Sequence, residues 1–486
     1  MTIRARLRQG EGWLCRVRVP LVLGLTLAIA FSLFAAPPLA PAKKSFTPPD
    51  FNLIAAGDAI TVTSLTARKS DPGFMGVVNV LRKADAAVLN FEGTFAGKEA
   101  YPAADTAGTW IASVPERLKD LKWAGFNLFS AANNHSVDFG ALGVLDTIRT
   151  FVRADAVYAG IGEDLGEARA ADYLTTTHGR IALVSCTSTF RPDSPAGQAR
   201  PDMRGRPGAS TLRHESIYSV DATGLQTLRE VWAKGFPAWG RTASLSGNTL
   251  SFQLQGEGPI IFDLARKPGL VTTPDPRDMV AITDEIRDAK EMADYVVVYM
   301  HAHEQDPSSV EVPAQFVIKF AHAAIDAGAD VFASSGPHLL RGIEIYKGKV
   351  ILYSLGNFIF ENDLVVPQPS DVYEQYNLGL NALPARLFDA RSDYDTKWWP
   401  ADPRDWESVL ANVTFHNGVP KEVTLTPIEL GYGNRRPDRG IPRLADPVMS
   451  ASILEHLQKL SQPFGTDIII RNGVGTVAIE SEHPME

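Results

Sequence analysis

Short apolar segments alternate with amphipathic segments through much of this chain, and that alternation limits its fold more than any other feature. Segments with helical periodicity lie at Gly76–Lys83, Pro115–Ala124 and Gly140–Val152. Strands that alternate with such helices indicate an α/β fold, with a mostly parallel sheet that carries helices on both faces. The apolar runs predicted as buried strands in the first half are Phe51–Gly57, Ala86–Asn90, Asn127–Ala131, Val157–Ile161 and Ile181–Thr187.

The second half interrupts this order and then resumes it. Residues 190–280 are rich in Gly, Pro and Arg and contain alternating stretches such as Thr249–Leu254, so we interpret them as an insertion. The main domain is predicted at 43–380, and a C-terminal extension that packs on it at 381–486. The elements predicted after the insertion are helices at Ala281–Ala293, Pro313–Ala327 and Ala445–Leu460, and strands at Tyr295–Met300, Val331–Ala333, Ile343–Tyr346, Val350–Tyr353, Val409–Phe415 and Glu422–Pro427.

Residues 1–42 have the order of a secretory signal. Five arginines lie between residues 4 and 18, an apolar run covers Val19–Ala36, and Ala40-Pro41-Ala42 fits an Ala-x-Ala cleavage site. An uncleaved N-terminal anchor is the alternative, because the apolar run is just long enough to span a bilayer. We therefore expect the protein to cross the cytoplasmic membrane and to work in the periplasm or cell envelope.

Charge and cysteine content exclude two classes of function. The formal net charge is −9, and it becomes −13 if the signal leaves with its five arginines and one glutamate. Such an acidic chain is not expected to bind nucleic acid. The two cysteines, Cys15 and Cys186, are too few for a disulfide framework or for a cysteine-based zinc site.

Residues that can bind metal or catalyse a reaction follow five of the predicted strands directly. In an open α/β sheet, ligands bind beyond the carboxyl ends of the strands, so these residues should meet at one edge. Carboxylate and amide oxygens together with imidazole nitrogens suit Zn, Mn or Fe rather than a metal that prefers thiolates. The residues are Asp58, Asn90, Glu92, Asn133, Asn134, His135, Asp138, His301, His303, Glu304 and His338.

Each of these residues also has a purely structural explanation. Asp58 could cap a turn, Glu92 could lie on the surface, and the two asparagines could shape a loop. For Asp138 we prefer the structural explanation, because it precedes Gly140 as the N-cap of a helix would. The repeated placement at strand ends nevertheless favours a metal site over a series of unrelated structural roles.

Several short motifs lie in a fixed order between about residues 51 and 360. They are Ala56-Gly57-Asp58, Leu89-Asn90-Phe91-Glu92-Gly93, Ala132-Asn133-Asn134-His135-Ser136, His301-Ala302-His303-Glu304, Gly336-Pro337-His338, Gly342-Ile343-Glu344-Ile345-Tyr346 and Tyr353-Ser354-Leu355-Gly356-Asn357-Phe358, and the third continues to Asp138 and Gly140. As an ordered set they resemble the CapA-like proteins of poly-γ-glutamate capsule synthesis. That family resembles a branch of the calcineurin-like metallophosphoesterases.

The resemblance implies a four-layer α/β/β/α sandwich of the metallophosphoesterase type and one or two divalent metal ions, Zn, Mn or Fe. It also implies that His135 protonates a leaving group. Two departures argue against two tight metal sites: Ile60 stands where the phosphoesterases have a histidine, and Ser335 stands where many relatives have one. The metal ligands implied by position are Asp58, Glu92, Asn134, His301 and His338, with His303 as a further ligand or as a group that orients one.

The implied function is capsule or poly-γ-glutamate biosynthesis outside the cytoplasm. The chain would act there as a divalent-metal-dependent hydrolase or transferase on an amide or phosphoester bond. A non-catalytic factor that binds, exports or assembles the polymer is one alternative, and a general phosphoesterase is another. The expected partners are an anionic polymer, or a peptide or phosphoester substrate, and capsule-synthesis machinery at the membrane.

Two charged groups have open roles. Glu304 is a candidate catalytic base, although a salt bridge with Arg341 is the slightly favoured alternative. A polyglutamate substrate would be repelled by so acidic a chain unless local positive charge offsets the repulsion. An arginine cluster in the insertion could supply that charge, or could simply form a solvated loop. Its members are Arg191, Arg200, Arg204 and Arg206.

Overall fold

Continuous apolar runs fold here as strands that are buried on both faces. Every residue of β2 (Ala86–Phe91) and β14 (Tyr295–His301) is buried, and so is all of β1 (Phe51–Ile60) except Asn52. Such strands are typical of parallel sheets covered by helices, and they confirm the α/β class. The computed structural model describes residues 49–106, 108–235, 242–246, 248–253 and 259–479, which belong to one unit, Thr47–Glu486. The predicted signal at 1–42 lies outside the described residues.

The larger of two main sheets has ten strands within the described residues, and β1 lies near its middle. Its order is β24-β25-β22-β21-β1-β2-β3-β4, with β20 also paired to β1 and β23 to β22. Strands β1 to β4 run parallel, whereas β21 runs antiparallel to β1. The C-terminal strands thus extend the same sheet that carries Asp58. The bounds are β3 (Leu128–Ser130), β4 (Val157–Ala159), β20 (Asn357–Phe360), β21 (Glu407–His416), β22 (Val419–Glu429), β23 (Arg443–Leu444), β24 (Ile469–Arg471) and β25 (Val474–Ala478).

The smaller main sheet has six strands in the described part of the chain, in the order β18-β19-β17-β14-β7-β6. Its inner strands run parallel, and each edge strand runs antiparallel to its neighbour. The predicted hairpin around Lys347-Gly348-Lys349 is therefore correct, because it forms the β18–β19 pair. The bounds are β6 (Asp172–Thr175), β7 (Arg180–Thr187), β17 (Val331–Ser335), β18 (Leu340–Tyr346) and β19 (Lys349–Leu355).

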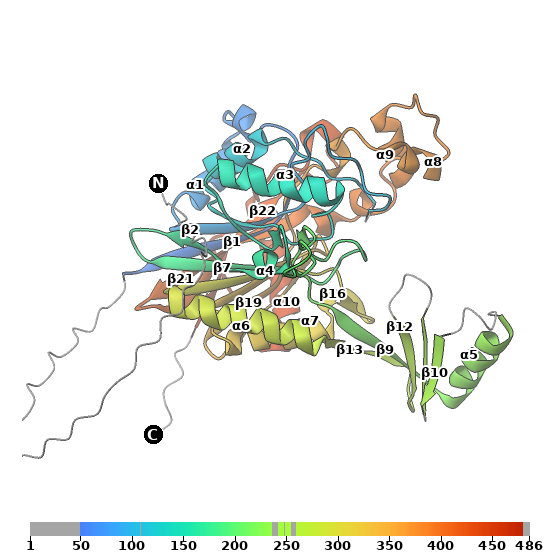
Figure 1. Ribbon diagram of the computed structural model, residues 1–486. Coiled ribbons are helices and arrows are strands. Elements are labelled where there is room, and N and C mark those ends of the chain that lie inside the picture. The colour runs from blue at the N-terminus through green and yellow to red at the C-terminus, as the bar shows by residue number, and fades with distance from the viewer. Residues whose placement is uncertain (1–48, 107, 236–241, 247, 254–258, 480–486) are drawn as a thin grey trace, which may run out of the picture. The chain divides into compact units, whose positions relative to one another are not determined.

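Helices cover the outer face of each main sheet (Figure 1). One apolar cluster joins the larger sheet to the first three α-helices, and another joins the smaller sheet to two later helices. Among the described residues, no helix combines the length and the apolar character needed to cross a bilayer. The helices are α1 (Pro72–Leu81), α2 (Glu116–Ala124) and α3 (Gly140–Arg153) on the larger sheet, and α6 (Pro276–Met292) and α7 (Gln315–Asp326) on the smaller one.

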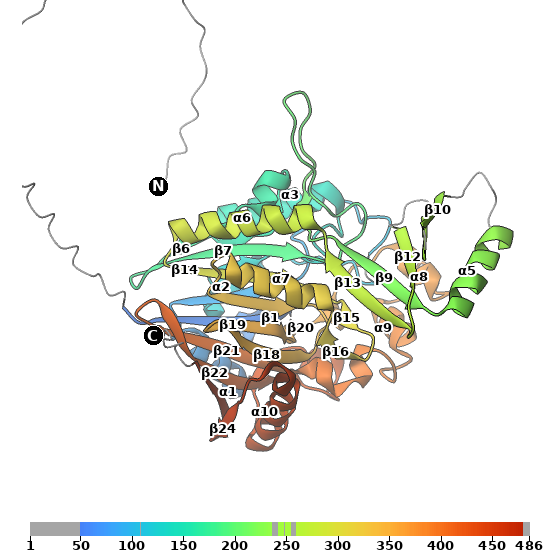
Figure 2. The same ribbon diagram turned by 90° about the horizontal axis from the view of Figure 1, so that it is seen from below.

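A third apolar cluster fills the space between the two main sheets. Phe51 and Val88 contribute to it from the larger sheet, and Tyr295 contributes from the smaller one. The C-terminal helix α10 (Pro447–Ser461) adds Leu454 and other apolar side chains to this inner cluster, and Figure 2 shows the helix beside β18. The core therefore has an inner layer between the sheets and two outer layers under the helices.

The segment between β7 and α6 contains a separate sheet of five strands among its described residues, in the order β10-β11-β12-β9-β13. The Phe316 N–H of α7 donates to the Thr272 hydroxyl of β13 at 3.1 Å, which joins this sheet to the core. The boundaries predicted for the insertion and for the C-terminal extension stay predictions. The bounds are β9 (His214–Val220), α5 (Ala222–Gly235), β10 (Thr242–Ser246), β11 (Thr249–Gln253), β12 (Pro259–Leu264) and β13 (Gly269–Pro274).

Asp-Pro pairs set the start of three helices. The carboxylates of Asp71, Asp275 and Asp446 each accept hydrogen bonds from backbone N–H groups of the first turn, and a proline follows each aspartate. Helix α6 therefore begins at Pro276 rather than at the predicted Ala281. The Asp275-Pro276 cap adds a first turn ahead of the apolar periodicity that begins near Ala281.

Gly57 shapes the part of β1 that carries Asp58. The register of β1 against β2 shifts between Ala55 and Asp58. A Cβ atom at Gly57 would lie 2.0 Å from the carbonyl oxygen of Gly356, and the Asp58 N–H donates to that same oxygen at 3.0 Å. Only glycine tolerates so close a backbone, so this residue lets β20 join β1 next to Asp58.

Candidate metal centre

The six predicted metal ligands lie in one cluster at the carboxyl ends of the parallel strands. Each comes from a strand or from the loop that follows it, so the strands of the two main sheets set their positions. Most of them are fully buried, and only His303 and His338 are partly exposed. The predicted ligands are Asp58 in β1, Glu92 after β2, Asn134 after β3, His301 and His303 at and after the end of β14, and His338 after β17.

Asp58 is held by three hydrogen bonds. Its Oδ1 atom accepts from the Asn90 amide at 2.7 Å and from the Ser335 hydroxyl at 2.5 Å, and its Oδ2 atom accepts from the Gly336 N–H at 2.9 Å. Burial opposes ionisation of this carboxyl, but His301 and the Ser335 hydroxyl help to outweigh it and hold the pKa below its usual value. Asp58 is therefore an oriented carboxylate, and its Oδ2 atom, which accepts only one of these bonds, keeps a lone pair for a cation.

Glu92 is buried and its carboxylate has no partner. Neither of its oxygens accepts a hydrogen bond within the described structure. Its Oε1 atom lies 3.8 Å from a nitrogen of His135 and 3.9 Å from nitrogens of both His301 and His338. Burial raises the pKa of Glu92 well above its usual value, and the charge of Asp58 raises it further. A buried carboxylate without donors is costly, so this position favours a bound positive charge.

The imidazoles of the cluster are close to one another. The Nε2 atoms of His301 and His303 lie 3.1 Å apart, and the Nδ1 atom of His338 lies 2.8 Å from the Asn357 side-chain oxygen. Burial lowers the pKa of His303 well below its usual value, and burial also lowers the pKa of His338. Neutral imidazoles keep a nitrogen lone pair, which is the form that binds metal.

These groups fit a divalent cation. Glu92 with His301 and His303 can offer three ligand atoms that all lie within 4.8 Å of one another, and Glu92 with Asp58 and His338 can do the same. Glu92 belongs to both groups, so its carboxylate is placed to face one ion or to lie between two. The side-chain oxygen of Asn134 is also buried without a hydrogen-bond partner. Oxygen and imidazole donors of this kind suit Zn, Mn or Fe.

His135 is oriented by Asp138, which corrects the interpretation of Asp138 as a helix cap. The Nδ1 atom of His135 lies 2.7 Å from Oδ2 of Asp138. The N-cap of α3 is Phe139, and no side chain caps this helix. Asp138 instead accepts from the Arg191 guanidinium at 3.2 Å and from the Thr106 hydroxyl at 2.6 Å. The Nε2 atom of His135 is thereby directed toward Glu92.

Glu304 is bound differently from the favoured expectation. Its carboxylate accepts from the hydroxyls of Ser188 at 2.6 Å and Thr189 at 3.0 Å. The Arg341 guanidinium donates to the backbone carbonyls of His303 and Glu304, at 3.2 and 3.1 Å, rather than to the Glu304 carboxylate. The expected salt bridge is therefore wrong in the described structure, and the role of Glu304 as a base stays a prediction.

The arginine cluster of residues 191–206 is partly neutralised by nearby aspartates. Arg200 pairs with Asp202 at 2.9 Å, and Arg206 donates to a backbone carbonyl at 2.9 Å. Arg191 reaches the candidate site only indirectly, through Asp138. Two of the four arginines are therefore paired with carboxylates, and a role of the cluster in attracting an anionic substrate stays a prediction.

A cleft of about 510 Å³ opens beside the cluster. Its lining includes His135, His303 and His338, together with Asn134 and Thr189. The remaining lining residues are mostly apolar or aromatic, and several of them come from the C-terminal part of the chain. They are Ile60, Thr109, Ile111, Phe360, Asn362, Tyr376, Arg391, Trp398 and Trp399.

Three neighbouring polar residues complete the site, and the predicted list of ligands does not include them. The Asn90 amide bridges Asp58 and His301, Ser335 holds Asp58, and Asn357 holds His338. Asn90 and Asn357 lie inside the short motifs of the sequence, so their positions were visible. Their roles as orienting groups depend on contacts between distant segments and could not be read from spacing.

Comparisons with known proteins agree with the motifs. The sequence model of the family described as "Bacterial capsule synthesis protein PGA_cap" matches residues 52–362. The chain is 36% identical over 449 residues to protein y4sH of Sinorhizobium fredii, which covers 88% of this chain and 93% of that protein. It is 25% identical over 374 residues to the PGA biosynthesis protein CapA of Bacillus subtilis, covering 75% and 77%. It is 26% identical over 295 residues to the capsule biosynthesis protein CapA of Bacillus anthracis, covering 60% and 54%.

Proposed function

Because this chain belongs to the PGA_cap family of bacterial capsule synthesis proteins, we propose that it acts in capsule biosynthesis as a divalent-metal-dependent hydrolase or transferase. The bond that it cleaves or transfers is an amide or a phosphoester of an anionic polymer such as poly-γ-glutamate. The relatives named for PGA and capsule biosynthesis support this class of polymer. The clustered carboxylates and imidazoles support the dependence on metal.

The observation that carries the proposal is the state of Glu92. This carboxylate is buried and lacks donors, yet nitrogens of three histidines lie within 4 Å of one of its oxygens. A protein gains no stability from such a group, so a functional ligand is the better explanation. Asp58, Glu92, His301, His303 and His338, with the Asn134 amide oxygen, would hold the ion. A divalent cation at such a site polarises a carbonyl or phosphoryl oxygen and lowers the pKa of water.

His135 is proposed as the group that gives a proton to the leaving atom. Asp138 holds its Nδ1 atom, so the Nε2 atom is left for the substrate in the cleft. Arg191 and Thr106 fix Asp138 in turn, which limits rotation of the imidazole. A histidine that is oriented in this way is suited to general acid catalysis.

The proposed location and the finer fold have their own support. The basic, apolar and small-residue order of residues 1–42 supports export to the periplasm or cell envelope. Two sheets with helices on both outer faces support a relationship to the four-layer sandwich of the metallophosphoesterases. Residues Glu407–Glu429 would then belong to the sandwich itself, because β21 pairs with β1.

Metal content measured by elemental mass spectrometry tests the proposal directly. We expect about one or more transition-metal ions per chain in the full-length protein, and a large loss in Glu92→Gln and His338→Ala. Glu291→Gln, which changes an exposed glutamate of α6, is the matched control and should keep the metal. His135→Ala should keep metal but lose metal-dependent turnover of γ-glutamyl polymers or phosphate esters.

Two results would change the conclusion. A wild-type protein that stays metal-free after incubation with Zn and Mn would remove the catalytic metal and leave a polymer-binding or assembly role. Metal-dependent binding of polymer without turnover would likewise favour a non-catalytic export or assembly factor.

A further inference from the structure

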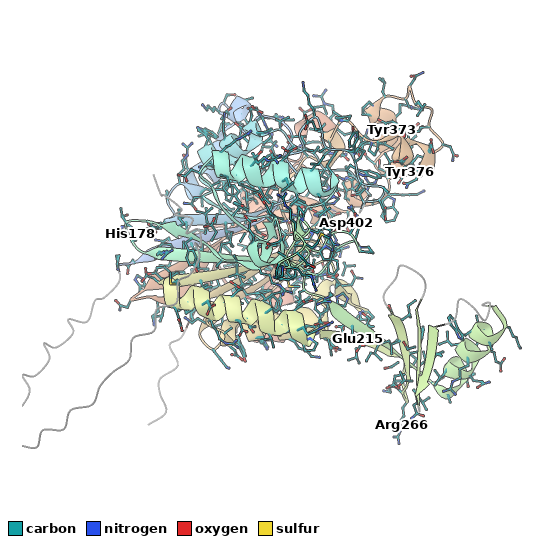
Figure 3. All side chains as sticks on the ribbon, in the orientation of Figure 1. His178, Glu215, Arg266, Tyr373, Tyr376 and Asp402 are labelled. Atoms are coloured by element: carbon teal, nitrogen blue, oxygen red, sulfur yellow. The ribbon has the colours of Figure 1, made fainter. Side chains whose placement is uncertain are left out.

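Part of the cleft wall comes from a C-terminal segment that lies outside the matched family region. That segment contains α8 (Ser370–Gln375) and α9 (Pro384–Ser392), whereas the family model ends at residue 362. Tyr376 directly follows α8, beside Tyr373 in Figure 3, and it lines the cleft. The part of the wall that this segment contributes therefore lies outside the residues that the family model matches.

Arg391 is a cation in this wall without an acidic partner. Its guanidinium donates to the Gly108 carbonyl at 2.9 Å and to the Thr109 hydroxyl, and it stacks 4.5 Å above the Trp399 ring. Among the described residues, no carboxylate lies within ion-pair distance of the Arg391 guanidinium. The nearby carboxylate of Asp363 pairs with Arg439 instead. Burial lowers the pKa of Arg391, as expected for a cation that lacks a counter-ion. A partly buried guanidinium that faces a cleft is a binding site for an oxyanion.

Trp398 adds an exposed apolar surface next to this cation. Its side chain is 71% exposed although it lines the cleft, and its backbone has φ +61°. Positive φ is unfavourable for so bulky a residue. Three residues shortly before it, Asp393, Tyr394 and Asp395, also have positive φ, at +49°, +58° and +65°. Strained backbone of this kind persists where surrounding contacts enforce it, and it gathers at ligand clamps.

Ion pairs enforce that conformation. Asp395 pairs with Arg436 at 2.9 Å and with Arg439 at 3.0 Å. The Trp399 indole N–H donates to Asp363 at 3.1 Å, and Asp363 is itself bound by Arg439. The loop is thus fixed at both ends. The exposed ring of Trp398 is therefore held in place before binding, so binding costs little conformational entropy.

We propose that Arg391, Trp398 and Tyr376 form a substrate subsite that binds a single oxyanion carried on a segment with an apolar face. This inference rests on the proposed function, because it places the subsite beside the reacting bond. A carboxylate of a γ-linked glutamyl chain has this chemistry, with methylene groups that can lie on an aromatic ring. A phosphate monoester on an apolar group shares it.

Calorimetric titration of the full chain with a short γ-linked glutamyl oligomer tests the subsite. Phenyl phosphate and the methyl-esterified oligomer are the comparison probes. Arg391→Gln should weaken binding of the charged oligomer by about tenfold or more, while Arg391→Lys should recover only part of the affinity. Trp398→Ala should weaken the charged and the esterified oligomer alike, by roughly fivefold.

Two matched variants control for nonspecific effects. Arg386→Gln removes a charge from the same helix, at a side chain that is 59% exposed and does not line the cleft. Tyr101→Ala removes an aromatic ring that is 80% exposed and likewise lies outside the cleft lining. Neither change should alter the affinity for any of the probes.

The outcomes separate the subsite from the metal centre. If folded Arg391→Gln and Trp398→Ala bind the oligomer as the wild type does, the subsite is refuted while the metal proposal stands. A wild-type chain that binds neither anionic probe also refutes it. Arg391-dependent binding supports it, and a preference for phenyl phosphate over the oligomer identifies phosphate as the anion. Metal content of the same samples tests the proposed function separately. If a metal-free wild type shows Arg391-dependent binding, the metal-dependent function is refuted and the subsite stands.

Discussion

Replacing Glu92 with glutamine is expected to raise the thermal stability of the metal-free protein and to abolish its further stabilisation by metal. The Glu92 carboxylate is buried, lacks hydrogen-bond donors and lies near Asp58 and Asp138, whose charges oppose its ionisation. Glutamine has nearly the same shape and no charge. An unsatisfied buried polar group costs about 1–3 kcal/mol, and a charged one costs more. The metal-free variant should therefore be more stable than wild type by about 1–3 kcal/mol.

The size of the unit converts these energies into temperatures. Unfolding entropy is about 2.1 cal/mol/K per residue, so the 440 residues of Thr47–Glu486 give about 0.9 kcal/mol/K. The variant should then melt about 1–3 °C above metal-free wild type. A cation at a hundredfold excess over its Kd stabilises the wild type by about 2.7 kcal/mol, or about 3 °C, and leaves the variant unchanged.

Differential scanning fluorimetry of chelator-treated full-length protein, with and without Zn or Mn, measures both effects. Glu291→Gln is the control, because this exposed glutamate of α6 lies outside the cluster, and it should follow the wild type in both conditions. The reasoning is refuted if Glu92→Gln melts below metal-free wild type, or if the cation raises both melting temperatures equally.

Three further substitutions have outcomes of different kinds. Gly57→Ala places a methyl group 2.0 Å from a backbone oxygen, so urea unfolding should show a loss of roughly 3 kcal/mol or more; wild-type stability would contradict the close approach of β20. Asp138→Ala deprives Arg191 of its buried partner, so Tm should fall by about 3–5 °C while metal content stays the same; loss of metal would instead make Asp138 a ligand. Burial raises the pKa of Asp405 to about 8, above its unfolded value, so its ionisation destabilises the fold as pH rises from about 4 to 8. Asp405→Asn should match wild type near pH 4 and exceed it by up to about 5 kcal/mol above pH 8 in urea unfolding, and a gain independent of pH would exclude this cause.

The sequence allowed prediction of the features that depend on local spacing. Asp58, Glu92 and His301 each lie at or just beyond the end of an apolar run, and parallel strands bring such ends to one edge. The α/β order and the β18–β19 hairpin were predictable for the same reason. The start of α6 was equally available, because Asp275-Pro276 is a local cap signal that also marks α1 and α10.

Contacts between distant segments could not be predicted from local spacing. Asp138 has the local pattern of a helix cap, but its partners Thr106 and Arg191 lie 32 and 53 positions away and turn it toward His135. Arg391 contacts Thr109 across 282 positions. Nothing in the spacing of the chain distinguishes that arginine from a solvated one, and the loop cluster of arginines was the more visible candidate for anion binding.

Binding of a cation at the metal centre and binding of an oxyanion at the Arg391 subsite should each raise the affinity for the other ligand, for an electrostatic reason. At physiological salt the Debye length is about 8 Å, so the net charge of −9 matters less to a substrate in the cleft than the groups beside it. Without a cation, the ionised carboxylate of Asp58 repels an oxyanion held near Arg391. A bound divalent cation offsets the charges of Asp58 and Glu92 and removes that repulsion. Affinity for an anionic oligomer should therefore rise with metal occupancy, and metal affinity should rise by the same factor when oligomer is present. Titration of each ligand with and without the other measures both factors. If the two factors differ, the two binding steps are not in equilibrium. If neither ligand changes the affinity for the other, the cation and the oxyanion do not share the cleft.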